Sequence, residues 1–149
     1  MKIYLDNCCY NRPFDDQKQR KVFLEAQAKL FIQDNIKQGT IKLVSSYVLI
    51  VEMQENSDIF KRDNIFQFVK NNSSAFIGED KFDEVENLAA PIIQTGIKRM
   101  DACHVAAAIV AKCDYLLTTD KRLLKYQTNK IKLVNPLEFI GIMEENDDE

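Results

Sequence analysis

The sequence of 149 residues is poor in the residues that interrupt regular structure, with only 4 glycines and 3 prolines. Such a composition indicates a chain with few loops and a high helix content. Hydrophobic residues make up 46% and charged residues 29%, which is typical of a folded globule rather than a disordered chain. A chain of this length is expected to form one domain, residues 1–149, that buries roughly 68–70% of its unfolded surface.

The sequence also lacks a long apolar run. No stretch approaches the roughly 18 consecutive apolar residues that indicate a membrane span, and the opening residues 1–6 leave no room for the apolar part of a signal peptide. We therefore expect a cytoplasmic protein with no membrane association. The cysteines show no C-x-x-C spacing, which favours buried thiols over disulfides. A zinc site formed by Cys9, Cys103 and His104 is an alternative that the sequence leaves open.

An excess of positive charge is missing as well. The formal net charge is −3 and the sequence pI is about 5.3, which excludes a protein that holds nucleic acid by a general basic field. Binding of a polyanion would have to depend on local cations. No G-x-G-x-x-G loop is present, so a dinucleotide-binding function is excluded.

Short β-type runs alternate with segments of helical periodicity along the chain. The predicted strands are 2–5, 41–44, 75–77, 115–119 and 131–134, and the predicted helices are 15–37, 47–53, 58–70, 79–94, 101–113, 120–126 and 136–143. Strands separated by helices predict βαβ crossovers, and hence an α/β fold with a mainly parallel sheet covered by helices on both faces. The acidic residues 144–149 are expected to form a flexible, solvated tail.

Four acidic residues occupy informative places in this pattern. Asp6 and Asp120 each follow a predicted strand, and the carboxyl ends of parallel strands meet at one edge of a sheet, where ligands bind. Asp101 stands near the start of an otherwise apolar helix, and Glu52 has apolar neighbours in the helix after the second strand. Each residue also has a structural interpretation, because Asp101 and Asp120 suit helix N-caps, Asp6 suits a turn, and Glu52 suits a solvent-facing position.

Carboxylates that converge on one edge would repel one another and raise one another's pKa unless a cation were present. Oxygen ligands without paired thiolates or imidazoles favour a hard ion, Mg²⁺ or Mn²⁺. The four acids together therefore predict a magnesium or manganese site.

These residues resemble the motifs of the PIN-domain nucleases, and within them the bacterial VapC-type toxins of toxin–antitoxin pairs. The similarity covers nearly the whole chain and rests on "IYLDN" with Asp6, "SSYVLIVEMQ" with Glu52, "KRMDACHVAAA" with Asp101 and "LLTTDKRLL" with Asp120. The closing "VNPLEFI" is also similar to the family's last strand and helix. Relatives commonly have Ser or Thr close behind the first Asp, whereas this chain has Asn7, which is expected to act as the polar neighbour.

The resemblance implies a PIN-like three-layer α/β/α fold and a metal-dependent endoribonuclease that hydrolyses phosphodiester bonds in RNA. Asp6 and Asp101 would be the direct ligands of Mg²⁺ or Mn²⁺, and Glu52 and Asp120 would act through water or on a second ion. The resemblance also implies an antitoxin protein as partner and a homodimer.

Local cations near the acids are candidates for binding the phosphates of RNA. They are Arg12, Arg99 and Lys121, with Lys98 and Arg122 close by. His104 lies one turn beyond Asp101, and we interpret it as a buried, hydrogen-bonded histidine outside the catalytic set.

Two other functions compete with the nuclease. A non-catalytic PIN-like module that binds RNA or protein would carry the same fold and the same acids. An aspartyl phosphotransferase of the haloacid-dehalogenase kind would need a second Asp two residues after Asp6, and that position holds Cys8.

Overall fold

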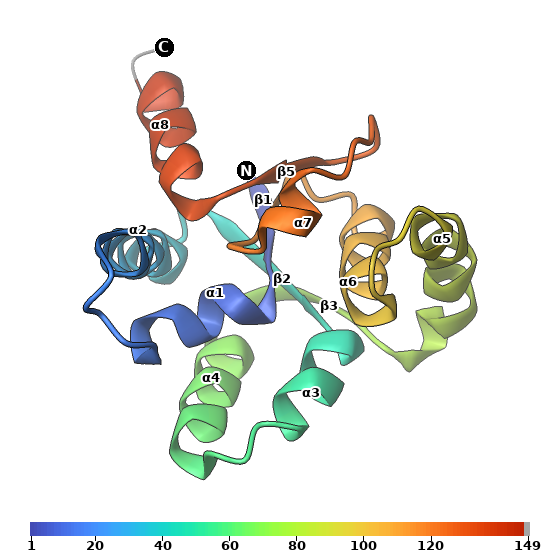
Figure 1. Ribbon diagram of the computed structural model, residues 1–149, viewed down its shortest axis with the longest axis horizontal. Coiled ribbons are helices and arrows are strands. Elements are labelled where there is room, and N and C mark those ends of the chain that lie inside the picture. The colour runs from blue at the N-terminus through green and yellow to red at the C-terminus, as the bar shows by residue number, and fades with distance from the viewer. Residues whose placement is uncertain (148–149) are drawn as a thin grey trace.

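The computed structural model describes residues 1–147 as alternating strands and helices (Figure 1). The strands are β1 (Lys2–Leu5), β2 (Lys42–Ser46), β3 (Ser73–Ile77), β4 (Tyr115–Leu117) and β5 (Lys132–Val134). The helices are α1 (Asn7–Asn11), α2 (Arg20–Lys37), α3 (Tyr47–Gln54), α4 (Ile59–Asn72), α5 (Phe82–Gln94), α6 (Arg99–Val110), α7 (Lys121–Leu124) and α8 (Pro136–Asp147). Short 3-10 turns cover Arg12–Phe14 and Glu79–Lys81.

The strands form one sheet in the order β3-β2-β1-β4-β5, and every pairing in it is parallel. The chain first builds outward from β1 through β2 to β3, and then returns to the other side of β1 for β4 and β5. The direction of winding therefore reverses between β1 and β4. In an open parallel sheet, such a reversal leaves a crevice beyond the carboxyl ends of the two strands, which is where a ligand site is expected.

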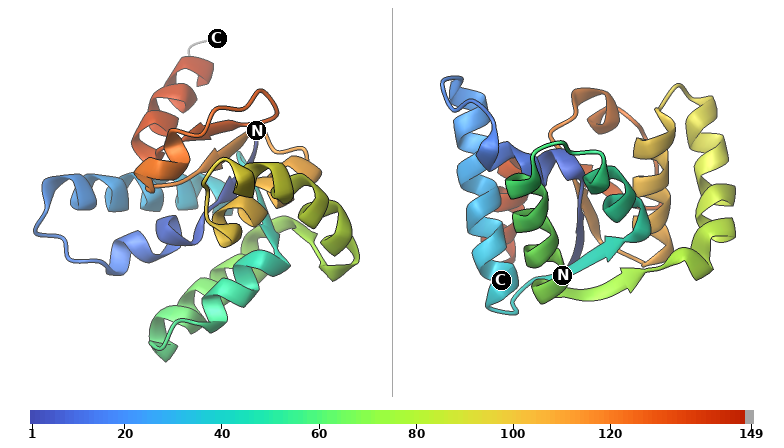
Figure 2. Two further views of the ribbon diagram at one scale, coloured as in Figure 1. Left: turned by 45° about the vertical axis from the view of Figure 1, so that its right-hand side comes forward. Right: turned by 90° about the horizontal axis from the view of Figure 1, so that it is seen from below.

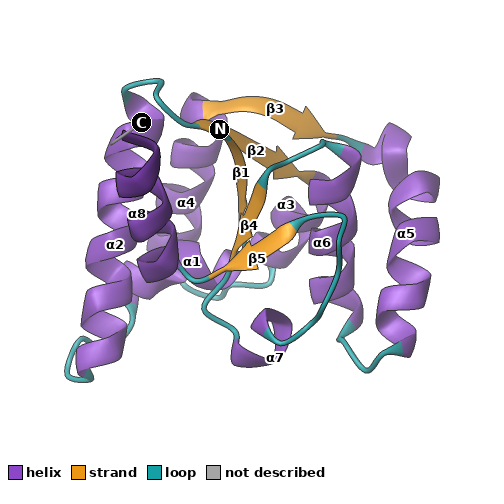
Figure 3. Ribbon diagram, turned by 90° about the horizontal axis from the view of Figure 1, so that it is seen from above, coloured by secondary structure: helices purple, strands orange, loops and turns teal. Residues whose placement is uncertain are grey.

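Helices cover both faces of the sheet, so the predicted three-layer α/β/α architecture is confirmed. Side chains alternate along β1, with Ile3 and Leu5 in the core of one face and Tyr4 in the core of the other. Helices α2, α4 and α8 pack on the first face, and α5 and α6 pack on the second (Figures 2 and 3). Because both faces are covered, strands such as β1 and β4 are apolar almost throughout.

The predicted element boundaries differ from the structure mainly around the sheet edge that carries the acids. The first long helix begins at Arg20 rather than at residue 15, and the segment 7–14 forms α1 and a 3-10 turn. Asp6 caps α1, because its side chain accepts the Asn7 N–H. Helix α6 begins at Arg99, two residues before its predicted start at Asp101.

The chain end also differs from the prediction. Helix α8 runs to Asp147, so residues 144–147 are the exposed last turn of a helix rather than a flexible tail. Phe139 and Met143 anchor this helix in the core of the first face. Residues 148–149 of the predicted tail lie outside the described residues. Within residues 1–147, no helix has both the length and the apolar character needed to cross a membrane.

Candidate metal centre

Asp6 stands at the crevice between β1 and β4, directly after the central strand. Its backbone N–H donates to the Leu117 carbonyl at 3.0 Å, which continues the pairing of the two strands. The carboxylate is only 3% exposed, and it accepts the Asn7 N–H at 2.7 Å and the Thr118 hydroxyl at 2.9 Å. Groups from both strands therefore fix its orientation, and none of these donors carries a positive charge.

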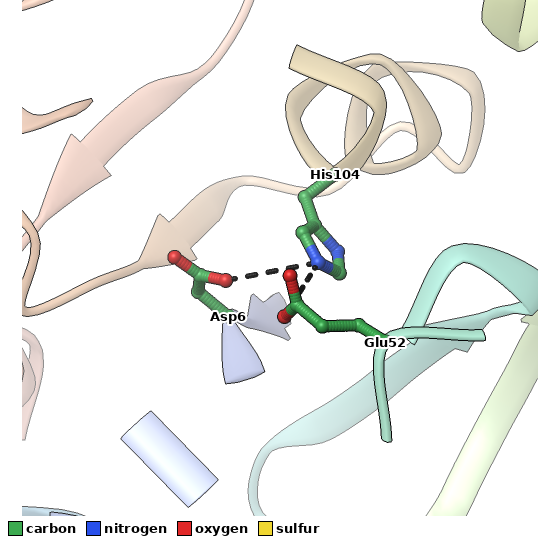
Figure 4. A group of neighbouring side chains, drawn as sticks. All are labelled: Asp6, Glu52 and His104. Atoms are coloured by element: carbon green, nitrogen blue, oxygen red, sulfur yellow. Dashed lines mark hydrogen bonds and ion pairs between the residues drawn. The ribbon is translucent and has the colours of Figure 1, made fainter. Parts of the chain in front are cut away.

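Glu52 and His104 face Asp6 from two helices (Figure 4). Nε2 of His104, on α6, lies 3.2 Å from Oε1 of Glu52, on α3, and 3.8 Å from Oδ1 of Asp6. One ligand atom from each of the three residues lies within 4.8 Å of the others. Two oxygens and one nitrogen so close together form a group that can hold a metal ion.

His104 is fully buried and is held from behind by a chain of hydrogen bonds. Its Nδ1 lies 2.6 Å from the Tyr4 hydroxyl, and this hydroxyl lies 2.6 Å from Oγ of Ser46. Ser46 also accepts the Leu49 N–H at 3.3 Å, at the start of α3. Burial lowers the pKa of His104, but the Glu52 hydrogen bond and the nearby charge of Asp6 outweigh it and raise the pKa above its usual value. His104 is thus the only one of these three residues that can carry a positive charge.

Asp101 and Asp120 complete the cluster of acids. Burial, followed by the charges of Asp6 and Asp120, raises the pKa of Asp101 to about 6. Asp120 caps α7, because its Oδ1 accepts the Arg122 N–H at 2.8 Å. The N-cap interpretation is therefore confirmed for Asp120 but wrong for Asp101, since Lys98 holds the cap position of α6.

All four predicted acids line one pocket of about 340 Å³, which we call the acid pocket. Asn7, Cys8, Asn11 and Asp15 also line it. The expected polar neighbour of Asp6 was the Asn7 side chain. Instead, Asn7 contributes its backbone N–H, and the Cys8 thiol lies 3.4 Å from Oδ2 of Asp6.

The residues of the acid pocket fit a divalent cation. Five carboxylates line the pocket, those of the four predicted acids and that of Asp15, and the imidazole of His104 contacts two of them, Asp6 and Glu52. Burial is the main cause of the raised pKa of Asp101, and repulsion by the nearby carboxylates adds to it. A bound divalent ion would remove this repulsion. The carboxylate oxygens suit Mg²⁺ or Mn²⁺, whereas an imidazole ligand is more usual for transition-metal ions.

No protein-family model matches the sequence, and no curated protein matches it. Solved structures do match. VapBC2 from Rickettsia felis, in a structure bound to a DNA fragment from their promoter, is similar with a TM-score of 0.55 at 14% identity, over 91% of this chain and 98% of that chain. FitAcB from Neisseria gonorrhoeae is similar with a TM-score of 0.53 at 16% identity, over the same shares of the two chains.

The chain has a PIN-like fold. These likenesses confirm the resemblance to VapC-type proteins at the level of the fold. The PIN-like architecture also places the acids as the sequence motifs predict, at the carboxyl ends of β1 and β4 and on the two helices that flank them.

The predicted phosphate-binding cations divide into two groups. Lys98, Lys121 and Arg122 line a second hollow of about 520 Å³ that shares Asp101 and Asp120 with the acid pocket. These three residues thus share a hollow with two of the acids.

Arg12 and Arg99 are instead engaged in ion pairs away from this hollow. Arg12 binds Glu25 at 2.9 Å and Asp15 at 3.1 Å, and Arg99 binds Glu86. The guanidinium of Arg12 donates through all three of its nitrogens to these two carboxylates. The main role of Arg12 is therefore structural.

Two residues of the site were not included in the sequence-based set. His104 was excluded as a buried, hydrogen-bonded histidine, which it is, but it also contacts both Asp6 and Glu52. Its spacing of three residues from Asp101, which puts both on one face of α6, was the available signal. Thr118 orients Asp6, and no sequence feature indicated this role.

The alternative zinc site is wrong. Cys9 belongs to the core on one face of the sheet, whereas Cys103 and His104 lie on the other face. The sheet therefore separates the two thiols.

Proposed function

We propose that this protein is a metal-dependent endoribonuclease that hydrolyses phosphodiester bonds in RNA, and that it acts as the toxin of a toxin–antitoxin pair. The observation that carries the proposal is the acid pocket, where Asp6, Glu52, Asp101 and Asp120 meet at the carboxyl edge of the sheet. Nothing in the packing of the core requires four carboxylates at this place, and their repulsion costs stability unless a cation binds.

In this proposal, Asp6 and Asp101 are the direct ligands of Mg²⁺ or Mn²⁺. Glu52 and Asp120 act through water or on a second ion. When bound, the ion neutralises charge on the scissile phosphate and lowers the pKa of the attacking water. The Tyr4 hydroxyl holds the His104 ring so that Nε2 faces Asp6 and Glu52, which fits a supporting role for the histidine.

The cations beside the acid pocket are proposed to bind the phosphates that flank the cut. Lys98, Lys121 and Arg122 line the adjoining hollow, so a strand that passes through it would lie against Asp101 and Asp120. Because the overall charge is negative, this local group rather than a general field would provide the affinity for RNA.

The test is cleavage of single-stranded RNA by the full chain, followed on a gel with a 5′-labelled substrate. We expect cleavage with Mn²⁺ or Mg²⁺, loss of cleavage with EDTA, and its return when Mn²⁺ is added in excess. The Asp101→Asn variant should be inactive, because it removes a proposed ligand and leaves the fold intact. Asp63→Asn, which changes an exposed aspartate of α4 outside the pocket, is the matched control and should remain active.

Cleavage that survives in Asp101→Asn would contradict this assignment of the site. Metal binding without cleavage of any RNA would favour the alternative, a non-catalytic PIN-like module that binds RNA or protein. Isothermal titration with Mn²⁺ on the same samples separates these two outcomes.

A protein partner belongs to the proposal. Helix α2 exposes four large apolar side chains, namely Phe23, Leu24, Leu30 and Phe31. An exposed apolar stripe on a helix is typical of a surface that another protein covers. We propose that an antitoxin contacts the protein, that two copies of the chain form a homodimer, and that the complex is cytoplasmic. Light scattering of the purified chain should give twice the mass of one copy.

A further inference from the structure

A third pocket lies where α3, α5 and α6 meet. It has a volume of about 410 Å³, and we call it the side pocket. Its walls include Tyr47 and Val51 of α3, Phe82 and Glu86 of α5, and Arg99 of α6. In Figure 1, α6 lies between α5 and the centre of the molecule, with α3 beside it.

The side pocket and the acid pocket are formed by neighbouring residues of the same two helices. On α3, Val51 lines the side pocket and the next residue, Glu52, lines the acid pocket. On α6, Arg99 lines the side pocket and Asp101 lines the acid pocket. Residues one or two positions apart point to different sides of a helix, so the two pockets lie on different sides of α3 and α6. A helix with its side chains is about 10–12 Å across, so a strand cleaved at the acid pocket would have to cross one helix to place a nucleotide in the side pocket.

The apolar part of the side pocket suits a flat aromatic ligand. The rings of Tyr47 and Phe82 lie with their centroids 6.1 Å apart, and Phe82 is 47% exposed although it is a large apolar residue. Exposed aromatic rings and arginine planes are the surfaces on which unpaired bases of RNA stack.

The polar part of the pocket has a definite order of donors and acceptors. Arg99 donates to Oε2 of Glu86, so the pair presents N–H donors next to two carboxylate oxygens that each have a further lone pair. The Watson–Crick edge of guanine offers the complementary order, with O6 as acceptor followed by N1–H and N2–H₂ as donors. Adenine and cytosine each offer one amino donor next to a ring nitrogen that only accepts, and this nitrogen would lie against the second carboxylate oxygen; uracil would place its second oxygen there.

We propose that the side pocket binds a guanine base next to the scissile bond, stacked against Tyr47 and Phe82 and recognised at its Watson–Crick edge by Arg99 and Glu86. This proposal rests on the proposed function, because it assigns the side pocket to the RNA that the acid pocket cleaves. It makes the nuclease selective for RNA with guanine at one position beside the cut.

The first experiment measures base binding without cleavage. GMP, AMP, CMP and UMP are titrated in EDTA into the full chain, labelled with ¹⁵N, and the amide shifts are followed by NMR. GMP should bind most tightly, with shifts centred on residues of α3, α5 and α6. Glu86→Gln should lower the affinity for GMP by about 5- to 150-fold, the range expected for one bidentate contact to a base. Glu84→Gln, on the exposed side of α5, is the matched control and should bind GMP as the unaltered chain does.

A further variant separates stacking from edge recognition. Phe82→Ala should lower the affinity for all four nucleotides by a similar factor, again about 5- to 150-fold, because stacking does not depend on the base. Equal binding of the four nucleotides by the unaltered chain, or GMP affinity unchanged in Glu86→Gln, would overturn the proposal.

The second experiment measures cleavage of oligonucleotides that differ only in the base beside the cut. The ratio of kcat/KM for guanine to that for adenine should fall in Glu86→Gln and stay unchanged in Glu84→Gln. Cleavage with no base preference would overturn the guanine site and leave the nuclease in place. GMP binding that depends on Glu86 in a chain that cleaves no RNA would support the guanine site and contradict the nuclease.

Discussion

Two buried carboxylates on the same polypeptide, Glu25 and Asp6, are stabilised in different ways. Glu25 is fully buried, and Arg12 binds it through two nitrogens while the Asn135 amide donates to its other oxygen. Asp6 is almost as buried, but its donors are the Asn7 N–H and the Thr118 hydroxyl, and its charged neighbours include further acids. The first carboxylate has a guanidinium built into the fold as its partner, whereas the second has only the imidazole of His104, 3.8 Å away.

The difference distinguishes a structural carboxylate from one that can bind a metal ion. A buried carboxylate that serves packing carries its partner with it, because an unpaired charge in the interior costs several kcal/mol. The fold gives Asp6 hydrogen-bond donors but only one weak cationic neighbour, His104. Asp6 can therefore still bind a metal ion. Changes at the first group should therefore affect stability, and changes at the second should affect metal binding and activity.

The largest expected effect is on stability at the Glu25 group. Arg12→Ala should lower the free energy of unfolding by about 3–5 kcal/mol, because it leaves the buried charge of Glu25 without its cation. In a chain of this size, this corresponds to a fall in Tm of roughly 6–20 °C. Thermal unfolding followed by circular dichroism measures it. Arg20→Ala, at an exposed position of α2, is the control, and an equal loss in both variants would remove the distinction between the two carboxylates.

Asp6→Asn should have a small effect on stability and a large effect on activity. The amide keeps one acceptor for the Asn7 N–H and removes one negative charge from the acid pocket, so the free energy of unfolding without metal should change by only about 1 kcal/mol. Cleavage of RNA should fall by more than the roughly 10- to 100-fold that is typical for the loss of an outer-shell partner. Unfolding curves and initial rates on one preparation test both parts. A large loss of stability would place Asp6 with Glu25 as a structural carboxylate.

Added Mn²⁺ should stabilise the unaltered chain through the acid pocket. At a concentration 100 times Kd, binding to the folded state alone contributes about 2.7 kcal/mol, which differential scanning calorimetry detects as a higher Tm. Arg20→Ala should show the same rise, and Asp6→Asn should show little of it. A rise in Tm that persists in Asp6→Asn would mean that Mn²⁺ binds elsewhere.

The smallest expected effect is the dependence of stability on pH in EDTA. The folded pKa of Asp101 is about 6 and its ordinary value is 3.8, so between these values the folded state holds more protons than the unfolded state. Stability from this group is therefore present below about pH 4 and is lost as the pH rises towards 6. Asp101→Asn should flatten the slope of Tm against pH in this window, and an unchanged slope would contradict the raised pKa that burial and the neighbouring acids give Asp101.

The sequence predicted the sheet and the four acids for reasons that the structure makes clear. The strands of a parallel sheet are buried on both faces, so their apolar runs are conspicuous, and an acid at the end of such a run marks the ligand-binding edge. Asp6 and Asp120 were found in this way. Glu52 and Asp101 were found as acids within otherwise apolar helices, and the structure brings them into the same pocket.

Other features depend on contacts that no local pattern encodes. The pairing of Arg12 with Glu25 joins the turn after α1 to α2, and the cations near an acid in sequence are not all near it in space. The role of His104 depends on Tyr4 and Ser46, which lie on two different strands. The short helix α1 was missed because the residues after Asp6 favour a turn, and a capped single turn of helix has the same composition.

The hydrogen-bond chain from His104 through Tyr4 and Ser46 ends at the backbone amide of Leu49. This amide is buried in the core and does not line the acid pocket. A change of protonation or ligation at the imidazole alters the polarity of each successive hydroxyl, and so alters the electron density at this N–H. The amide resonance of Leu49 should therefore report events at the acids, without any probe that could obstruct the pocket.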